Sequence, residues 1–259
     1  MPDPAEDRSE ETTEDLFLGG RLRLRQPRRG HRAGHDAILL ASATRVQSGQ
    51  RVVEFGAGVG AAGLSVSHRV PGIDLTLVEI DAALAALARA NAAANGIDAQ
   101  VIALDVTAGA DVFAASGLGP DSADVVLMNP PFHDAGRHRA SPDPARRTAH
   151  LATDDTLTAW IHAARRVLKS GGSLTLIWRA DGLAEVLAAL ERGFGSVAVV
   201  PVHPAPDAVA IRILIRAVKG GRAPLVLHPG FALQDADGNV PQKVQAVLGG
   251  TAVLPLADS

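Results

Sequence analysis

Four consecutive residues, Asn129-Pro130-Pro131-Phe132, could form an ordinary turn, but they also combine groups that could bind and activate an aromatic amino group. The lone pair of such a nitrogen is delocalised into its ring, so the nitrogen is a poor nucleophile. An Asn side-chain oxygen and a proline carbonyl oxygen could accept its two hydrogens, and two prolines would stiffen the loop that carries these acceptors. The ring of Phe132 could stack on a planar substrate. The apolar run 124–128 precedes the loop, so we expect these residues at the end of a buried strand.

A second candidate site is the glycine-rich sequence 56–60, which follows the apolar run 51–55. Glycines between a strand and a helix allow a ligand to approach the backbone at the helix N-terminus. Glu79, at the end of the next expected strand, could accept hydrogen bonds from both hydroxyls of a ribose. Asp105 ends a third expected strand and could bind an adenine amino group or cap its own loop. These features predict a nucleoside-containing ligand, but they also fit a nicotinamide dinucleotide.

Strands that alternate with helices are expected to position these residues. The pattern predicts strands at 20–25, 51–55, 74–78, 100–103, 123–128, 173–178, 197–202 and 209–217, and helices at 36–41, 60–69, 82–95, 154–168 and 181–192. Thr153 or Asp154 is the expected cap of the fourth helix, and Gly171-Gly172 its stop. This alternation predicts an α/β fold with a mostly parallel, doubly wound sheet.

Composition excludes several kinds of site. The chain has 259 residues, 47% of them hydrophobic, which is enough for one large α/β domain. It has no cysteine, which excludes disulfides, zinc–thiolate sites and cysteine nucleophiles. His133, His138 and His150 lack the spacing of metal ligands, so no metal is expected. No run approaches the roughly 18 apolar residues that span a membrane, and the N-terminus is acidic, so we expect a cytoplasmic protein that does not enter membranes.

Charge is unevenly distributed along the chain. Residues 1–15 contain seven acidic residues and one arginine, so they carry −6 of the total net charge of −3 and leave +3 on the remainder. This tail has almost no apolar residues and is expected to be disordered. Residues 21–32 then contain six arginines and no acidic residue. An arginine-rich segment is usually a solvated face, but it can also bind an anionic partner such as RNA.

The Asn-Pro-Pro-Phe sequence, placed after a fourth core strand and behind a glycine loop, resembles the catalytic signature of class I amino-group methyltransferases, which use S-adenosylmethionine. The resemblance extends from Glu54 to about residue 217 and implies a seven-stranded sheet with a short N-terminal strand and helix extension. Glu54 supports it, since methyltransferases commonly carry an acid there and dinucleotide dehydrogenases usually do not. The resemblance implies that the catalytic residues are Asn129, Pro130, Pro131 and Phe132. It implies an S-adenosylmethionine site formed by Asp36, Glu54, Phe55, Gly56, Ala57, Gly58, Gly60, Glu79, Ile80, Asp81, Asp105, Val106 and Asn129.

The segment 34–40 resembles one particular family within the amino-group methyltransferases. Its sequence Gly-His-Asp-Ala-Ile-Leu-Leu is similar to the Gly-x-Asp-x-Ile-Leu-Leu segment of bacterial valine-tRNA adenine-N6 methyltransferases, which modify the adenine beside the anticodon. The resemblance implies that Asp36 approaches the methionine end of the cofactor, although Asp36 could instead be a helix N-cap. Phe132 departs from the usual Tyr, which removes a hydroxyl but preserves stacking. The expected partner is tRNA, with contacts from Arg28, Arg29, Arg32, Arg137, Arg139, Arg146 and Arg147.

Four segments follow from these patterns: the acidic tail 1–15, an N-terminal extension 16–48 acting as a lid, a methyltransferase core 49–219 and a C-terminal appendage 220–259. Within the methyltransferases, a protein glutamine amide and guanine N2 of rRNA are alternative substrates. A nicotinamide-dependent oxidoreductase would leave the Asn-Pro-Pro loop unexplained. A catalytically silent RNA-binding module of the same fold is a further alternative.

Overall fold

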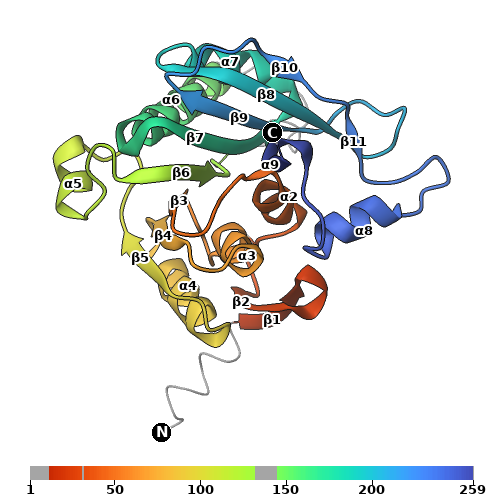
Figure 1. Cartoon of the computed structure of the whole chain (residues 1–259), viewed down its shortest axis with the longest axis horizontal. Coiled ribbons are helices and arrows are strands. Elements are labelled where there is room, and N and C mark those ends of the chain that lie inside the picture. The colour runs from red at the N-terminus through yellow and green to blue at the C-terminus, as the bar shows by residue number, and fades with distance from the viewer. Residues whose placement is uncertain (1–11, 31, 132–144, 259) are drawn as a thin grey trace, which may run out of the picture.

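The protein is built around one twisted, mostly parallel sheet (Figure 1). The computed structural model describes residues 12–30, 32–131 and 145–258, of which 145–155 are described by their backbone only. The sheet has the strand order β10-β8-β9-β7-β6-β3-β4-β5, and β11 pairs with β8. Its strands are β3 (Arg51–Phe55), β4 (Asp74–Glu79), β5 (Ala99–Ala103), β6 (Ala123–Met128), β7 (Leu168–Arg179), β8 (Phe194–His203), β9 (Arg212–Lys219), β10 (Val226–Leu227) and β11 (Phe231–Ala232).

All neighbouring strands are parallel except at β9, which runs antiparallel to both β7 and β8. The seven strands β3 to β9 are the expected core, and the two-residue strands β10 and β11 raise the count to nine in the described chain. The central strands are buried on both faces, which explains their continuous apolar sequences. In β3, for example, Val52 belongs to one apolar cluster and Val53 to the other.

Helices cover both faces of the sheet, as a doubly wound fold requires (Figure 1). One face carries α2 (His35–Ala43), α3 (Ala61–Arg69) and α4 (Ala82–Ala94). The other carries α5 (Ala110–Ala115), α6 (Ala145–Val167) and α7 (Leu183–Leu190), with a short 3-10 turn, η2 (Ala180–Gly182), leading into α7. No described helix is both long and apolar enough to cross a membrane.

Several expected boundaries were wrong. The helix expected to begin near residue 154 begins at Ala145, so neither Thr153 nor Asp154 is its cap. It ends at Val167, and β7 begins at the next residue, before the glycines expected to stop the helix. The strand expected from residue 209 begins at Arg212, and α5 was not expected at all. The six residues of α5 are too few for a helical pattern to be recognised in sequence.

An antiparallel hairpin precedes the core. It joins β1 (Thr12–Phe17) to β2 (Leu22–Pro27) through η1 (Leu18–Gly20). The alternation expected in β2 is confirmed, since Leu22 and Leu24 are buried while Arg23 and Arg25 are exposed. The disorder expected for the whole of 1–15 was wrong for residues 12–15, which lie in β1. Residues 1–11 lie outside the described chain.

Asn91 of α4 and Asn95, the C-cap residue of that helix, attach this hairpin to the core. Asn95 pairs with the backbone of Arg23, whose N–H donates to Oδ1 at 2.9 Å and whose carbonyl accepts from Nδ2 at 2.7 Å. Asn91 pairs in the same way with Arg25, at 2.8 and 3.1 Å. Because the two asparagines are one helical turn apart, they match alternate residues of the strand. Asn91 also donates to the Val59 carbonyl at 3.0 Å, so it links the hairpin to the glycine loop.

The C-terminal segment packs on the same face as α2. Helices α8 (Gln242–Leu248) and α9 (Pro255–Asp258) bury Val244, Val247 and Leu256 in the apolar cluster that includes α2 and α3. The Leu254 N–H donates to the Ser42 carbonyl at 2.9 Å. The segment expected to be an appendage therefore forms part of the main core.

Candidate functional site

The carboxyl ends of β3, β4, β5 and β6 meet at one edge of the sheet and border a cavity of about 680 Å³. Ligands of open α/β sheets bind at this edge. The residues of the expected cofactor and catalytic sites that line the cavity are Asp36, Glu54, Gly56, Ala57, Gly58, Glu79, Ile80, Asp105, Val106, Asn129, Pro130 and Pro131. Phe55, Gly60 and Asp81 do not line it. Phe132 lies outside the described residues.

The glycine loop adopts a conformation that other residues disfavour. Gly56, Gly58 and Gly60 have φ angles of 64°, 55° and 87°, in the left-handed region. A Cβ atom on Gly56 would lie 2.4 Å from the Trp160 ring. Trp160 is a cavity residue that the sequence analysis missed. It comes from α6, on the opposite face of the sheet from α3, and no local motif marks its contact with the loop.

The three expected residues that do not line the cavity support its walls. Phe55 is fully buried and packs edge-on against Phe113, with ring centroids 5.9 Å apart. Gly60 is the N-cap residue of α3. Asp81 caps α4, accepting from the backbone N–H groups of Ala83 and Leu84.

Glu54 is a buried acid inside the central strand β3. Its Oε2 accepts a hydrogen bond of 2.7 Å from the Gly63 N–H. Burial raises the pKa of Glu54 to about 8, against the opposing effect of the Gly63 hydrogen bond and with a smaller contribution from the charge of Glu79. The raised pKa favours the neutral form of Glu54 at pH 7. A Cβ atom on Gly63 would lie 2.6 Å from Oε2, so this glycine makes room for the acid.

Glu79 and Asp105 follow neighbouring strands and face the same cavity. Both Glu79 oxygens accept backbone hydrogen bonds, Oε2 from Gly58 at 2.7 Å and Oε1 from Asp81 at 2.9 Å. Glu79 thus shapes the glycine loop as well as presenting a carboxylate to a ligand. Asp105 Oδ1 caps its own loop through Thr107, as one of its two expected roles required. Beside them Ile80 is 66% exposed and contributes apolar surface to the cavity wall.

Asn129 follows the last residue of β6 and is held next to Pro130 and Pro131. Its Oδ1 is buried and has no hydrogen-bond partner among the described residues. A buried acceptor without a donor costs free energy, so it is a place where a ligand N–H or O–H is expected.

A strap of residues 32–37 forms another wall of the cavity. Asp36 lies in the first turn of α2, whose N-cap is Gly34, so the N-cap role considered for Asp36 was wrong. Its Oδ2 instead accepts from Arg212 Nε at 3.0 Å. Arg32, expected to contact RNA, also lines the cavity.

Four of the arginines expected to contact RNA have undescribed side chains. Arg137 and Arg139 lie outside the described residues, and the side chains of Arg146 and Arg147 in α6 are not described. Arg28 and Arg29 are exposed just after β2. His133, His138 and the side chain of His150 also fall outside, and the described residues contain no cluster of three or more metal-ligating side chains.

The architecture and this cavity together define a class I methyltransferase fold. A protein from Listeria monocytogenes assigned to the class I S-adenosylmethionine-dependent methyltransferases has the same fold, with a TM-score of 0.55 over 78% of this chain and 65% of that one, at 15% identity. The model of the methyltransferase small domain family matches residues 34–203, and the chain belongs to that family.

Three similar proteins differ in their stated substrates. Ribosomal RNA small subunit methyltransferase C of Pseudomonas syringae is 36% identical over 142 residues, which cover 55% of this chain and 36% of that protein. The tRNA1(Val) (adenine(37)-N6)-methyltransferase of Porphyromonas gingivalis is 30% identical over 66% of this chain and 68% of that one. A crystal structure from Agrobacterium tumefaciens, described as an O-methyltransferase, has a TM-score of 0.72 and 30% identity over 85% of this chain and 98% of that one. The chain therefore spans little more than a third of the first relative and nearly all of the third.

Proposed function

We propose that this protein transfers a methyl group from S-adenosylmethionine to an exocyclic amino group, and that the group is N6 of an adenine in tRNA. The observation that carries the proposal is the buried Oδ1 of Asn129, which lies beside two prolines in the cavity and has no hydrogen-bond partner among the described residues. The site needs a donor there, and a substrate amino group provides one.

The residues of the cavity fit the cofactor. Glu79 presents a carboxylate for the ribose hydroxyls, Asp105 an acceptor for the adenine amino group and Ile80 a surface for the adenine ring. The positive-φ glycines let a ligand approach the loop closely. When bound, the cofactor supplies an electrophilic methyl group on a sulfonium, and this transfer needs no metal.

The chain's own part in the reaction is to hold the nitrogen. Asn129 Oδ1 and the Pro130 carbonyl accept its two N–H groups, which localises the lone pair away from the ring and directs it at the methyl carbon. Held in this way, the nitrogen would be positioned to take the methyl group from a bound cofactor, with S-adenosylhomocysteine as the leaving group, and the proton that the methylated nitrogen gives up would pass to solvent water. Because the prolines fix the loop, little reorganisation is needed when the substrate binds. An adenine must leave its stack to reach a cavity at the sheet edge.

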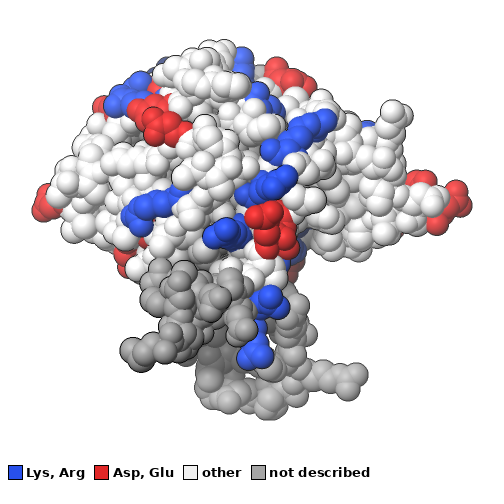
Figure 2. All heavy atoms as spheres, turned by 90° about the horizontal axis from the view of Figure 1, so that it is seen from below, with Lys and Arg blue, Asp and Glu red and all other residues white. Residues whose placement is uncertain are grey.

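Exposed arginines favour RNA over a protein substrate. Figure 2 shows several basic side chains across the middle of the face seen from below, with an acidic group beside them. The exposed arginines of the hairpin, of the residues just after it and of α4 are Arg21, Arg23, Arg25, Arg28, Arg29 and Arg89. Such a surface suits a phosphate backbone. The tRNA relative favours tRNA adenine, the ribosomal relative makes rRNA the second candidate, and a cytoplasmic location belongs to the same proposal.

The decisive experiment offers labelled S-adenosylmethionine and separate pools of unmodified tRNA and rRNA, followed by mass analysis of the nucleosides. N6-methyladenosine from tRNA is the expected product. N2-methylguanosine from rRNA would move the activity to the second candidate. A label on ribose oxygen would contradict amino-group transfer, and a label that enters only added protein would indicate a glutamine amide.

A further inference from the structure

We infer that Arg32 binds the carboxylate of the amino-acid part of the cofactor, and that a partly buried network of the hairpin presents it. This inference rests on the proposed use of S-adenosylmethionine. It moves Arg32 from the RNA-binding surface, where its sequence neighbours place it, into the cofactor site.

Charge complementarity is the first support. The cavity is lined by four acidic residues, Asp36, Glu54, Glu79 and Asp105, and Arg32 is the one Lys or Arg among its described lining residues. S-adenosylmethionine carries two positive groups, the sulfonium and the ammonium, and one negative group, the carboxylate. A carboxylate entering an acidic cavity needs a cation, and a guanidinium binds it through two parallel hydrogen bonds.

The position of Arg32 is the second support. The adenosine end of the ligand is expected at Glu79 and Asp105, so its amino-acid end must lie towards the glycine loop and the strap. Asn91 joins Arg25 of β2 to Val59 of the glycine loop. The next residue of β2, Gln26, holds Ala33, the strap residue that follows Arg32. This chain of contacts ties the segment that carries Arg32 to the glycine loop, and both line the same cavity.

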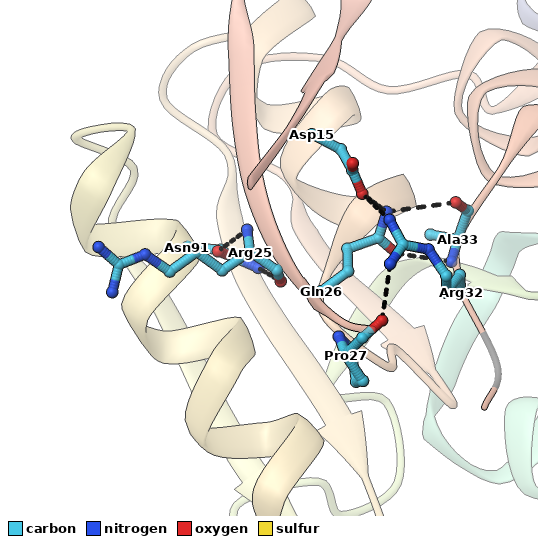
Figure 3. A network of polar contacts seen from close by, with 7 residues as sticks. All are labelled: Asp15, Arg25, Gln26, Pro27, Arg32, Ala33 and Asn91. Carbon is cyan, nitrogen blue, oxygen red and sulfur yellow. Dashed lines mark hydrogen bonds and ion pairs between the residues drawn. The ribbon is translucent and has the colours of Figure 1, made fainter. Parts of the chain in front are cut away.

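Figure 3 shows how the hairpin presents the guanidinium. Gln26 is 2% exposed and pairs with the backbone of Ala33, accepting from its N–H at 2.8 Å and donating to its carbonyl at 3.5 Å. Its Nε2 also donates to Asp15 Oδ2 at 2.7 Å, and the same carboxylate accepts from Arg32. Arg32 donates in addition to the Pro27 carbonyl at 2.7 Å.

These contacts fix Arg32 without exhausting its donors. A guanidinium has five N–H groups. Asp15 and Pro27 take one from each terminal nitrogen, and the described residues supply no other partner. The remaining donors can face a ligand, because the side chain is 33% exposed and borders the cavity.

The test compares two ligands that differ only in the carboxylate, S-adenosylmethionine and its decarboxylated form, by calorimetric titration. We expect the unaltered protein to prefer the carboxylated ligand by about 10-fold or more, the scale of a charged hydrogen-bond pair. Arg32→Ala should lose that preference while its affinity for the decarboxylated ligand stays within about 3-fold. Arg32→Gln keeps a donor for Asp15 and should lose the preference equally.

The other outcomes contradict the inference. An equal loss for both ligands in Arg32→Ala would mean that Arg32 only supports the wall, and an unchanged preference would remove it from the cofactor site. In the latter case, weakened RNA binding would return Arg32 to the RNA surface. Arg222→Ala, an exposed arginine away from the cavity, is the matched control and should keep the preference. Failure of the unaltered protein to bind either ligand would instead contradict the proposed function.

Discussion

Asn129 is the residue on which the proposed chemistry depends most directly, since its buried Oδ1 lacks a donor in the described structure. We expect Asn129→Ala to lower turnover by about 10² or more, the scale for removing one preorganised hydrogen-bonding group at a reacting centre. Affinity for S-adenosylhomocysteine should stay within a few-fold. Single-turnover methylation and calorimetry together make this measurement, and near-normal turnover would exclude the Asn-Pro-Pro loop from the mechanism.

Glu79 has a double role that its two backbone hydrogen bonds reveal. Glu79→Ala should weaken cofactor binding by about 1.5–3 kcal/mol, because the ribose loses a charged acceptor and the glycine loop loses its hydrogen bond from Gly58. Glu79→Gln keeps one acceptor oxygen and should lose less. Titration with S-adenosylhomocysteine distinguishes the two variants, and equal affinity in both and in the unaltered protein would contradict the ribose assignment.

The raised pKa of Glu54 predicts that the free energy of unfolding depends on pH. Its pKa is raised from 4.5 to about 8 in the folded protein, so between these values the folded state holds a proton that the unfolded state has released. The contribution of Glu54 to the free energy of unfolding is therefore largest below pH 4.5. It falls as pH rises towards 8, by up to roughly 1.4 kcal/mol per pH unit. Urea unfolding of Glu54→Gln, compared with the unaltered protein, should show a flatter profile across pH 5–8. Identical profiles would show that Glu54 is already ionised in the folded protein.

The hairpin is bonded to the strap that lines the cavity, and it also carries exposed arginines that are proposed to contact RNA. Its inner face carries the network around Gln26, while Arg28 and Arg29 are exposed at its end. Replacing both arginines by Ala should weaken RNA binding and lower the log–log salt slope by about 0.7–0.9 for each lost phosphate contact. Cofactor affinity should not change, and Arg222→Ala should bind RNA normally. A slope equal to that of the unaltered protein would indicate that Arg28 and Arg29 make only ordinary surface ion pairs.

Helices and strands were predictable from the sequence where the apolar pattern is long or where turn residues, glycines or acidic residues mark its ends. Strands β3 and β6 have the bounds expected from their apolar runs and flanking turns, and each of α3 and α4 differs by one residue at one end from the bounds expected from glycine and acidic boundaries. The hairpin strand β1 was missed because its sequence, rich in Thr, Glu and Asp, reads as a solvated tail. It is ordered by tertiary contacts, through the burial of Phe17 and the pairing of Asp15, which local sequence does not report.

Some residues of the candidate site were likewise predictable from the sequence and others were not. Asn129, Glu79 and the glycine loop were predictable, because each stands at a strand end and a single sheet edge gathers such ends. Trp160 and Arg32 were not, since both reach the cavity from segments whose place depends on packing across the whole chain. Arg32 also lies among arginines that face solvent, so its sequence neighbours indicated an RNA contact and did not indicate its place in the cavity wall.

At the scale of the whole molecule, the C-terminal helices are predicted to stabilise the cavity's own scaffold. Leu256 of α9 is fully buried in the cluster that contains α2. We expect Leu256→Ala to lower the free energy of unfolding by about 2–5 kcal/mol in urea denaturation. Val240→Ala, at a position 44% exposed, should change it little. A small effect at Leu256 would mean that α9 unfolds independently of the core.

The packing of α8 and α9 on α2 also has a consequence for synthesis on the ribosome. Helix α2 is made before every strand of the main sheet, but the helices that cover it are made after β9. A nascent chain that has already released all seven core strands therefore still exposes Ile38 and its neighbours, which meet α8 in the finished protein. Domains complete their packing only when the last contributing segment emerges. The strap that leads into α2 is consequently the latest wall to become rigid, and the nascent chain should acquire cofactor affinity only after α8 and α9 have left the exit tunnel.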